Sequence, residues 1–333
     1  MFAAVCQGQG AAPARSRAQD TRDGAHGRAA VFRREAPAWW SLKRQQGPKT
    51  HPLLLTRVHD LHSAPIGQLG GAERFQHHPA VAALKSRLDG AFLADLEARD
   101  AEVDWALPED APGAMRALGV LGLVPDVYRW LADAATPEEV VTFLAYEGGP
   151  DGGFDDLVAA CQIGLSGSAK LELAQNYWDE MGNGQLDLVH TELHHKLAGA
   201  LGLPALSPAD QPLEALERAA LASVLATNRR LQPEMVGALG LLELQAGPRC
   251  RKVVTALRRI GASDDALHFY LEHATVDPRH GKDWVDKAVV PLGADPRWAE
   301  GITRGGRWRS LVNAAFFDAM GRRFVPVASR LAS

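Results

Sequence analysis

Apolar residues recur at helical spacing along most of the chain from about residue 78, and this periodicity limits the fold more than any other feature. Residues three or four positions apart share one face of an α-helix, whereas a strand alternates at every second residue. Long alternating runs of β-branched residues are hard to find, and alanine and leucine are abundant. Because 46% of the 333 residues are hydrophobic, the chain can bury a sizeable core. The sequence therefore predicts an all-α fold.

Local signals place the boundaries of the expected helices. Thr136 is followed by Pro137 and Glu139, which together form a capping box that starts a helix ending at the glycines 148–149. Glycines 182 and 184 interrupt the next polar region. Helices are expected at 80–98, 117–132 with a break at Pro125, 136–148, from about 155, 168–181, 186–202, 211–229, 233–245, 248–260, 264–288 and 306–321.

The N-terminal segment differs from the rest in composition. Its first 50 or so residues are rich in Ala, Gly, Gln and Arg, with only Asp20, Asp23 and Glu35 opposing the basic residues. The segment has no apolar stretch of the kind found in secretory signals. It is interpreted either as a basic arm for an acidic partner or as an extension outside the fold. We expect a largely disordered extension over residues 1–70 and one helical domain over residues 71–333.

Composition excludes several classes of function. The formal net charge of −4 gives no basic excess for nucleic acid, and no apolar run is long enough to span a bilayer. Three cysteines, Cys6, Cys161 and Cys250, are sparse and widely spaced, which argues against a disulfide scaffold and favours the reducing cytoplasm. The expected partner is a small-molecule substrate, and the prediction allows a homodimer.

The strongest local signal for chemistry is His273-x3-Asp277-x2-His280. Offsets of four and three residues place these side chains on one stripe of a helix. Two imidazoles and a carboxylate form a suitable set of ligands for a transition metal. A solvated polar face remains the alternative, because Pro278 and Arg279 also suggest a helix end.

Glu180, Asp187 and His190 form a second stripe, provided that the helix continues through the two glycines. Each glycine costs about 1 kcal/mol inside a helix, so the continuation requires a compensating interaction. An ordinary amphipathic surface is the alternative interpretation, because other acidic residues lie nearby.

Glu147 and Glu243 are carboxylates on apolar helices. Glu147 ends the apolar face that carries Val140, Phe143 and Leu144, so it points toward the core, where an unpaired carboxylate is costly. Glu243 is expected to support ligands or to pair within the core rather than to bind metal. Three separate helices thus offer mixed carboxylate and imidazole ligands, a set that suits two irons better than one zinc.

These motifs resemble the haem-oxygenase-like diiron oxidases, also called the iron-containing redox enzyme family. The resemblance rests on the order of Glu, Glu-x6-Asp-x2-His and His-x3-Asp-x2-His, and on the segments YEGGPDGGFDD, LELAQNYWDEMGNG and HFYLEHATVDPRHGKDW. It covers roughly residues 75–320. It implies a seven-helix haem-oxygenase-like bundle with a loose N-terminal extension. It also implies six iron ligands: Glu147, Glu180, His190, His273, Asp277 and His280. Asp187 occupies the position of an additional glutamate ligand in some members, and aspartate is one methylene shorter.

The resemblance further implies two Fe(II) ions and O2 as co-substrate. Such an oxygenase or oxidase would act on a small amine, amino acid or carboxylic acid by N-oxygenation, desaturation or oxidative C–C cleavage. The alternatives are a metal-free member of the same fold, such as a relative of thiaminase II or pyrroloquinoline-quinone synthase, and a haem oxygenase that uses His77 or His78. A non-catalytic helical protein that binds metal or a partner is the alternative from another class.

Overall fold

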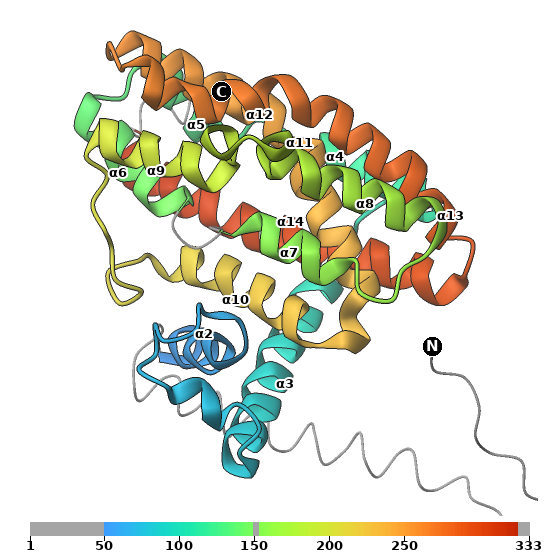
Figure 1. The fold of residues 1–333 in the computed structure, drawn as a ribbon. Helices are drawn as coiled ribbons and strands as arrows, with labels where there is room; N and C mark the ends of the chain where they lie inside the picture. Colours follow the sequence, from blue (N-terminus) through green and yellow to red (C-terminus); the bar gives the residue numbers. More distant parts are fainter. Residues whose placement is uncertain (1–49, 149–152, 326–333) are drawn as a thin grey trace, which may run out of the picture. The chain divides into compact units, whose positions relative to one another are not determined.

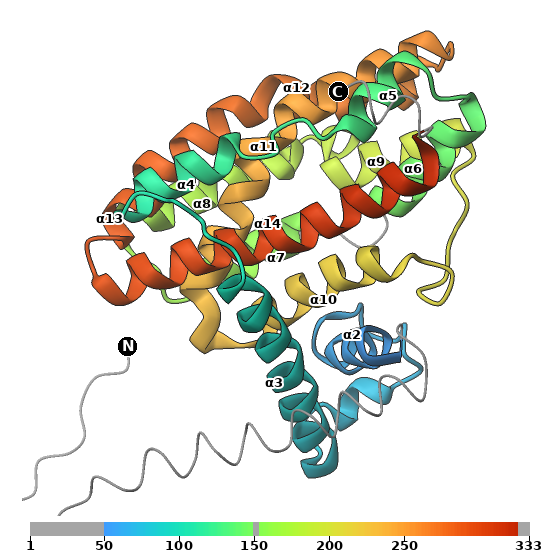
Figure 2. The same cartoon turned by 180° about the vertical axis from the view of Figure 1, so that it is seen from behind.

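A computed structural model describes residues 50–148 and 153–325 of the chain. The chain divides into two units, 1–42 and 43–333, and all described residues belong to the second. Every regular element of the described residues is helical, as the sequence predicts (Figures 1 and 2). None of the helices in these residues is both long and apolar enough to cross a membrane.

The elements follow one another in a simple order along the chain. The α-helices are α2 (Thr50–Ser63), α3 (Pro79–Ala101), α4 (Ala111–Val120), α5 (Asp126–Asp133), α6 (Pro137–Gly148), α7 (Phe154–Cys161), α8 (Gly167–Glu180), α9 (His190–Leu201), α10 (Leu213–Thr227), α11 (Gln232–Arg259), α12 (Asp264–Asp283), α13 (Val290–Leu292) and α14 (Pro296–Phe324). Shorter segments are the 3-10 turns η1 (Ala72–Phe75), η2 (Gly182–Gly184), η3 (Leu186–Leu188) and η4 (Arg229–Leu231), and the π-helical turn η5 (Trp284–Val289).

Helix α11 forms the centre of the core. Residues 234–241 are all buried, which is the pattern of a helix covered on every side. It packs against α4, α5, α12 and α14, and both views show it between α12 and α14 (Figures 1 and 2). Helices α11, α12 and α14 therefore share one core, and packing rather than loops positions the side chains that point into it.

The capping box that the sequence predicts at the start of α6 is confirmed. The backbone N–H of Thr136 donates to Glu139 Oε2 at 2.8 Å, and the N–H of Glu139 donates to Thr136 Oγ1 at 3.3 Å. Two of the otherwise unpaired N–H groups at the helix start are thereby satisfied. At its other end α6 reaches Gly148, the last residue described before 153.

Two helices are longer than the sequence indicates. The separate helices expected at 233–245 and 248–260 are one continuous helix, α11, with Pro248 inside it. Helix α14 begins at Pro296, ten residues before the helix expected at 306–321. Helix α12 and η5 together span residues 264–289, close to the expected 264–288, and so continue through Pro278. Proline cannot donate to the carbonyl of Ala274 one turn earlier. Arg251 Nη1 of α11 donates to that carbonyl at 3.2 Å, which offsets the loss.

The backbones of α11 and α12 approach each other unusually closely. A Cβ atom on Gly281 of α12 would lie 2.9 Å from the Glu243 carbonyl oxygen and from two backbone atoms of Leu244. A Cβ atom on Gly247 would lie 3.0 Å from the ring of Pro278. Only glycine allows this approach without a shift of one helix. The contact brings Glu243 of α11 next to the α12 turn that carries Asp277 and His280.

Part of the predicted N-terminal extension is an ordered helix. The extension was expected to cover residues 1–70, but α2 occupies residues 50–63 and buries Leu55, Val58 and His59. His59 Nε2 lies 2.7 Å from Asp89 Oδ1 of α3, and its Nδ1 lies 2.5 Å from Thr227 Oγ1 of α10. This buried polar contact attaches α2 to α3 and α10, and the local composition of the segment does not reveal it. The expectation for residues 1–49 lies outside the described residues.

Replacing Gly281 with alanine should destabilise the protein by about 1–3 kcal/mol, because the new methyl group meets fixed backbone. Gly90 of α3 is the matched control, since nothing lies within 4 Å of a Cβ atom there. Gly90→Ala should instead stabilise by about 0.5–1 kcal/mol through helix propensity. Urea unfolding monitored by circular dichroism measures both. Equal stability of the two variants would mean that α11 and α12 can move apart at Gly281 without a measurable cost in unfolding free energy.

Replacing His59 with alanine should lower the unfolding free energy by about 1–3 kcal/mol, because the buried Asp89 carboxylate and Thr227 hydroxyl lose a partner. His62→Ala, at an exposed position of the same helix, should have little effect. Thermal unfolding of both variants tests this, and an unchanged midpoint for His59→Ala would show that α2 does not contribute to the stability of the bundle.

Candidate metal centre

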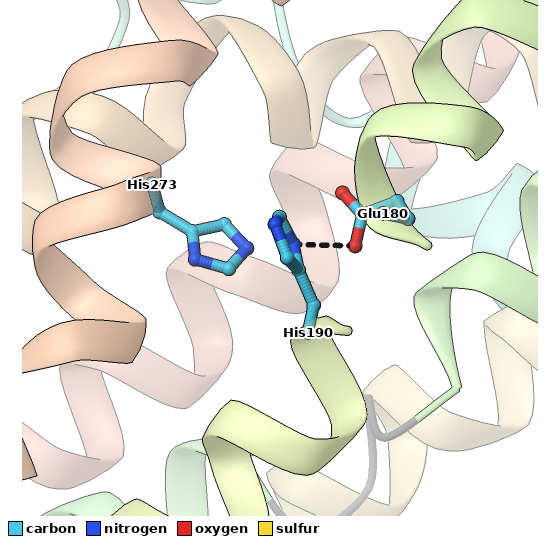
Figure 3. Close-up of side chains that lie close together, drawn as sticks. All are labelled: Glu180, His190 and His273. Atoms are coloured by element: carbon cyan, nitrogen blue, oxygen red, sulfur yellow. Dashed lines mark ion pairs between the residues drawn. The ribbon is translucent and has the colours of Figure 1, made fainter. Parts of the chain in front are cut away.

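The first group of candidate ligands joins the end of α8, the start of α9 and the middle of α12. We call Glu180, His190 and His273 the first triad, because one ligand atom from each lies within 4.8 Å of the other two. Figure 3 shows the ring of His190 between the other two side chains, with Nδ1 of His190 2.7 Å from Glu180 Oε2. The rings of His190 and His273 have centroids 4.5 Å apart. The backbone carbonyl of Phe269 lies 2.7 Å from His273 Nδ1, so this carbonyl orients the ring.

The second group joins α11 and the C-terminal part of α12. Glu243, Asp277 and His280, the second triad, also have one ligand atom each within 4.8 Å of the others. All three are buried, with relative exposures of 4%, 2% and 3%. Asp277 and His280 share a face of α12 with His273, as the spacing predicts, so α12 contributes to both triads. The close contact at Gly281 places Glu243 opposite them.

The connection from α8 to α9 does not have the form that the sequence suggests. The stripe of Glu180, Asp187 and His190 requires a helix that continues through the glycines, but α8 ends at Glu180. Gly182 and Asn183 have φ angles of 59° and 52°, and a Cβ atom on Gly182 would lie 2.5 Å from the backbone of Leu188. The chain therefore turns back on itself before α9 begins.

This turn separates Asp187 from the other predicted ligands. Asp187 lies in η3 and is exposed, and its backbone carbonyl accepts a hydrogen bond from Lys196 Nζ at 2.9 Å. It belongs to neither triad. Glu180 and His190 still meet, because the turn brings the end of α8 against the start of α9 rather than because they share a helical stripe.

Glu147 belongs to neither triad. It is at the end of α6 and accepts a hydrogen bond from the hydroxyl of Tyr128. Burial, reinforced by the Glu147 carboxylate, holds the pKa of Tyr128 and of Tyr270 well above its usual range. Glu147 therefore faces a pair of protonated phenols, and its role as an iron ligand stays a prediction.

One cavity of about 700 Å³ connects these groups. Glu147 lines this cavity, and so do five of the six triad residues: Glu180, His190, His273, Glu243 and Asp277. Its remaining wall combines aromatic and aliphatic side chains with two arginines. These residues include Tyr128, Phe154, Arg218, Leu242, Arg249, Val253, Phe269, Tyr270 and Phe317. The cavity has the size and the mixed lining of a site for a small organic molecule.

The carboxylates of the two triads differ in their electrostatic surroundings. Burial opposes the charge of Glu180, but the neighbouring imidazole of His190 outweighs it and the pKa of Glu180 falls. The pKa of His190 is raised, because the same carboxylate outweighs the effect of burial. Burial lowers the pKa of His273 to about 4. In the first triad, the imidazole of His190 therefore balances much of the negative charge of the Glu180 carboxylate.

The second triad does not compensate its charge in this way. Burial, with repulsion from the Glu180 carboxylate, raises the pKa of Glu243 to about 8. Burial and repulsion from Glu243 hold the pKa of Asp277 well above its usual range. Two buried carboxyl groups side by side lack a cation among the described residues that would let both ionise. A divalent metal ion would supply that charge.

The donor atoms of the two triads fit iron. Three carboxylates and three imidazoles, without a thiolate, are the mixed oxygen and nitrogen ligands that iron accepts. Nδ1 of His280 is buried and makes no hydrogen bond to any described residue. Buried polar atoms without a partner are uncommon and indicate a bound ion or water. This unpaired atom and the uncompensated carboxylates thus both point to bound metal ions.

Glu243 is the candidate ligand that sequence reasoning assigned to a supporting role. It lies in the second triad and is as buried as Asp277 and His280. The available signal is the one used for Glu147, a carboxylate on an apolar helix, because residues 235–242 directly before Glu243 contain no charged or polar side chain. The sequence does not reveal the close contact of α11 with α12. This contact is the reason why Glu243 faces Asp277.

Comparison with known proteins agrees with this geometry. The family model described as iron-containing redox enzyme matches residues 143–313, slightly more than half of the chain. Both triads and Glu147 lie inside the matched region. No curated protein matches the chain. With two buried groups of carboxylate and imidazole ligands in an all-helical fold, the chain belongs to the iron-containing redox enzyme family.

Proposed function

We propose that this protein is a non-haem diiron oxygenase or oxidase, in which each triad holds one Fe(II) ion. The observation that carries the proposal is the pair of buried three-residue groups on α8, α9, α11 and α12, which share one cavity. We further propose that the helices form the seven-helix haem-oxygenase-like arrangement of the family. The substrate would be a small amine, amino acid or carboxylic acid that undergoes N-oxygenation, desaturation or C–C cleavage.

The residues around the triads suit oxidation of a bound organic molecule. Iron in such a site supplies the activation of O2 and the removal of electrons from the substrate. The aromatic and aliphatic walls, which include Phe269 and Phe317, exclude water from the reacting groups. Arg249 is fixed against the wall, because its Nε and Nη2 atoms donate to the carbonyls of Leu123 and Gly122 at 3.0 and 3.1 Å. Nη2 also donates to Gln245 Oε1 at 2.7 Å, so the hydrogens on Nη1 are the ones left to meet the carboxylate of an amino acid or a carboxylic acid.

A metal-free, thiaminase-like member of the same fold is less consistent with the site. A thiaminase-like enzyme needs a reactive cysteine, but burial raises the pKa of Cys161 to about 12. Cys250 reaches the cavity wall, yet burial and the Asp277 carboxylate hold its pKa well above the usual range. Neither thiol is activated as a nucleophile. Without a metal, the buried carboxyl groups of the second triad would have no function in such an enzyme.

Anaerobic reconstitution with Fe(II) should load two ions per chain, one for each triad. His273→Ala removes a ligand of the first triad, and Glu243→Ala removes one of the second. Each variant should therefore retain one ion or none, and both should keep the helical circular dichroism of the wild type. Iron analysis and Mössbauer spectroscopy of the reconstituted proteins measure the loading.

His195→Ala is the matched control, because His195 is a largely exposed histidine of α9 outside both triads. It should load two ions. Full loading of both triad variants would refute the site assignment. If the ferrous wild type loads two ions but does not consume O2 with any candidate substrate, the protein is a metal-binding protein rather than an oxidase.

Removal of the metal should make stability depend on pH above neutrality. With a pKa of about 8, Glu243 keeps a proton in the native state that the unfolded chain, with a pKa of 4.5, has already released. The unfolding free energy of metal-free protein should then fall by about 1–2 kcal/mol from pH 6.5 to pH 8. The raised pKa of His190 acts in the same direction. His273, with its lowered pKa of about 4, acts in the opposite direction by only about 0.4 kcal/mol, because the unfolded imidazole loses its remaining half proton over this interval.

Urea unfolding of metal-free wild type and Glu243→Gln at the two pH values tests this expectation. The variant, which cannot ionise at this position, should show a smaller fall. Fe(II)-loaded wild type should show none of this dependence, because a metal ligand is already deprotonated. An identical slope for wild type and variant would mean that Glu243 is charged in the metal-free protein.

A further inference from the structure

Asp179 contacts the second triad from outside it. The residue precedes Glu180 in α8, and its side chain is only 9% exposed. Asp179 Oδ2 lies 2.9 Å from Nε2 of His280. Two further donors hold the carboxylate in place, since Gln175 Nε2 donates to Oδ1 and Arg279 Nη2 donates to Oδ2, each at 3.0 Å. The carboxylate is therefore fixed at the back of the His280 ring.

This contact determines which nitrogen of His280 carries hydrogen. A carboxylate oxygen can only accept a hydrogen bond, so at 2.9 Å the hydrogen belongs to Nε2. Arg279 Nη2 also approaches Nε2, but at 3.5 Å it is the weaker contact. Nδ1 of neutral His280 is then left with its lone pair. This atom is buried, has no hydrogen-bond partner among the described residues, and lies 3.7 Å from Glu243 Oε2.

A second residue on the same face of α8 orients the opposite ligand. Asn176 lies three residues before Asp179, and its Nδ2 donates to Glu243 Oε1 at 2.8 Å. Residues at this spacing share one side of a helix, and both are buried. Helix α8 thus contacts two members of the second triad, the imidazole of His280 and the carboxylate of Glu243.

The two triads differ in the groups that orient their imidazoles. His273 of the first triad has the uncharged carbonyl of Phe269 at its Nδ1 atom. His280 of the second triad has a carboxylate at its Nε2 atom. A carboxylate partner fixes the tautomer and makes the imidazole a stronger donor, and loss of such a partner weakens metal binding by about 10- to 100-fold.

We propose that Asp179 is a positioning residue of the second triad, which presents Nδ1 of His280 to the metal and strengthens its binding. The inference rests on the proposed metal function of the triads. Asp179 itself belongs to neither triad, and it acts through the ring of His280.

The first test uses metal-free protein, so that it does not depend on iron loading. Nitrogen-15 NMR of protein labelled at histidine distinguishes the two neutral tautomers, and His280→Gln identifies the signals of His280. Wild type should carry the hydrogen of His280 on Nε2. Asp179→Ala should lose this preference. A hydrogen on Nδ1 in the wild type, or an unchanged tautomer in Asp179→Ala, would overturn the proposal.

The second test measures anaerobic Fe(II) binding at equilibrium, with Mössbauer spectra to distinguish the two ions. Asp179→Ala should bind one of the two ions about 10- to 100-fold more weakly than wild type, and the other ion with nearly unchanged affinity. Asp179→Asn keeps an oxygen acceptor of the same size but lacks the charge, so its loss should be smaller. This second variant separates the effect of the carboxylate from that of a cavity.

Asp100→Asn is the matched control. Asp100 is a partly buried carboxylate that pairs with Arg307 at 2.7 Å, away from the cavity. It should bind both ions as wild type does. Wild-type affinity for both ions in folded Asp179→Ala would refute the positioning role and leave the diiron proposal intact. Failure of the wild type to bind two ions would refute the diiron proposal, and the tautomer measurement would still decide the role of Asp179.

Discussion

The candidate metal centre depends on the close packing of α11 against α12. At Gly281 the two backbones approach so closely that no side chain fits between them. This contact sets the distance from Glu243 to the face of α12 that carries Asp277 and His280. The burial that follows prevents these carboxyl groups from ionising together without a cation. Helix packing thus brings together buried carboxyl groups whose negative charges have no balancing cation in the described part of the chain, and a bound metal ion supplies the positive charge.

The family, the helical class and many of the helix boundaries could be predicted from the sequence. Periodicity and capping signals are local, so the start of α6 at the capping box and the start of α3 at Pro79 follow from a few neighbouring residues. Local signals are misleading where tertiary contacts override them. Gly247 and Pro248 separate the two helices expected at 233–245 and 248–260, but α11 continues through both residues. Nothing in the sequence near Pro248 indicates the helices that pack around α11 there.

The candidate site shows the same limit. The stripe on α12 follows from spacing within one helix, and the structure places all three of its residues in the triads. The stripe through Asp187 fails because it requires a helix where the glycines produce a turn. Glu243 was assigned a supporting role because its partners come from a different helix. Spacing predicts which residues share a face, whereas only packing determines which faces meet.

The positions of the triads along the chain have a consequence for the order of assembly during folding. All ligands of the second triad come from α11 and α12, which are consecutive helices joined by a short connection. The first triad also needs the end of α8 and the start of α9, which lie far from α12 in the sequence. Closing a short chain segment costs less entropy than closing a long one. The hairpin of α11 and α12 can therefore form half of the centre by itself, before the earlier helices dock and complete the other half.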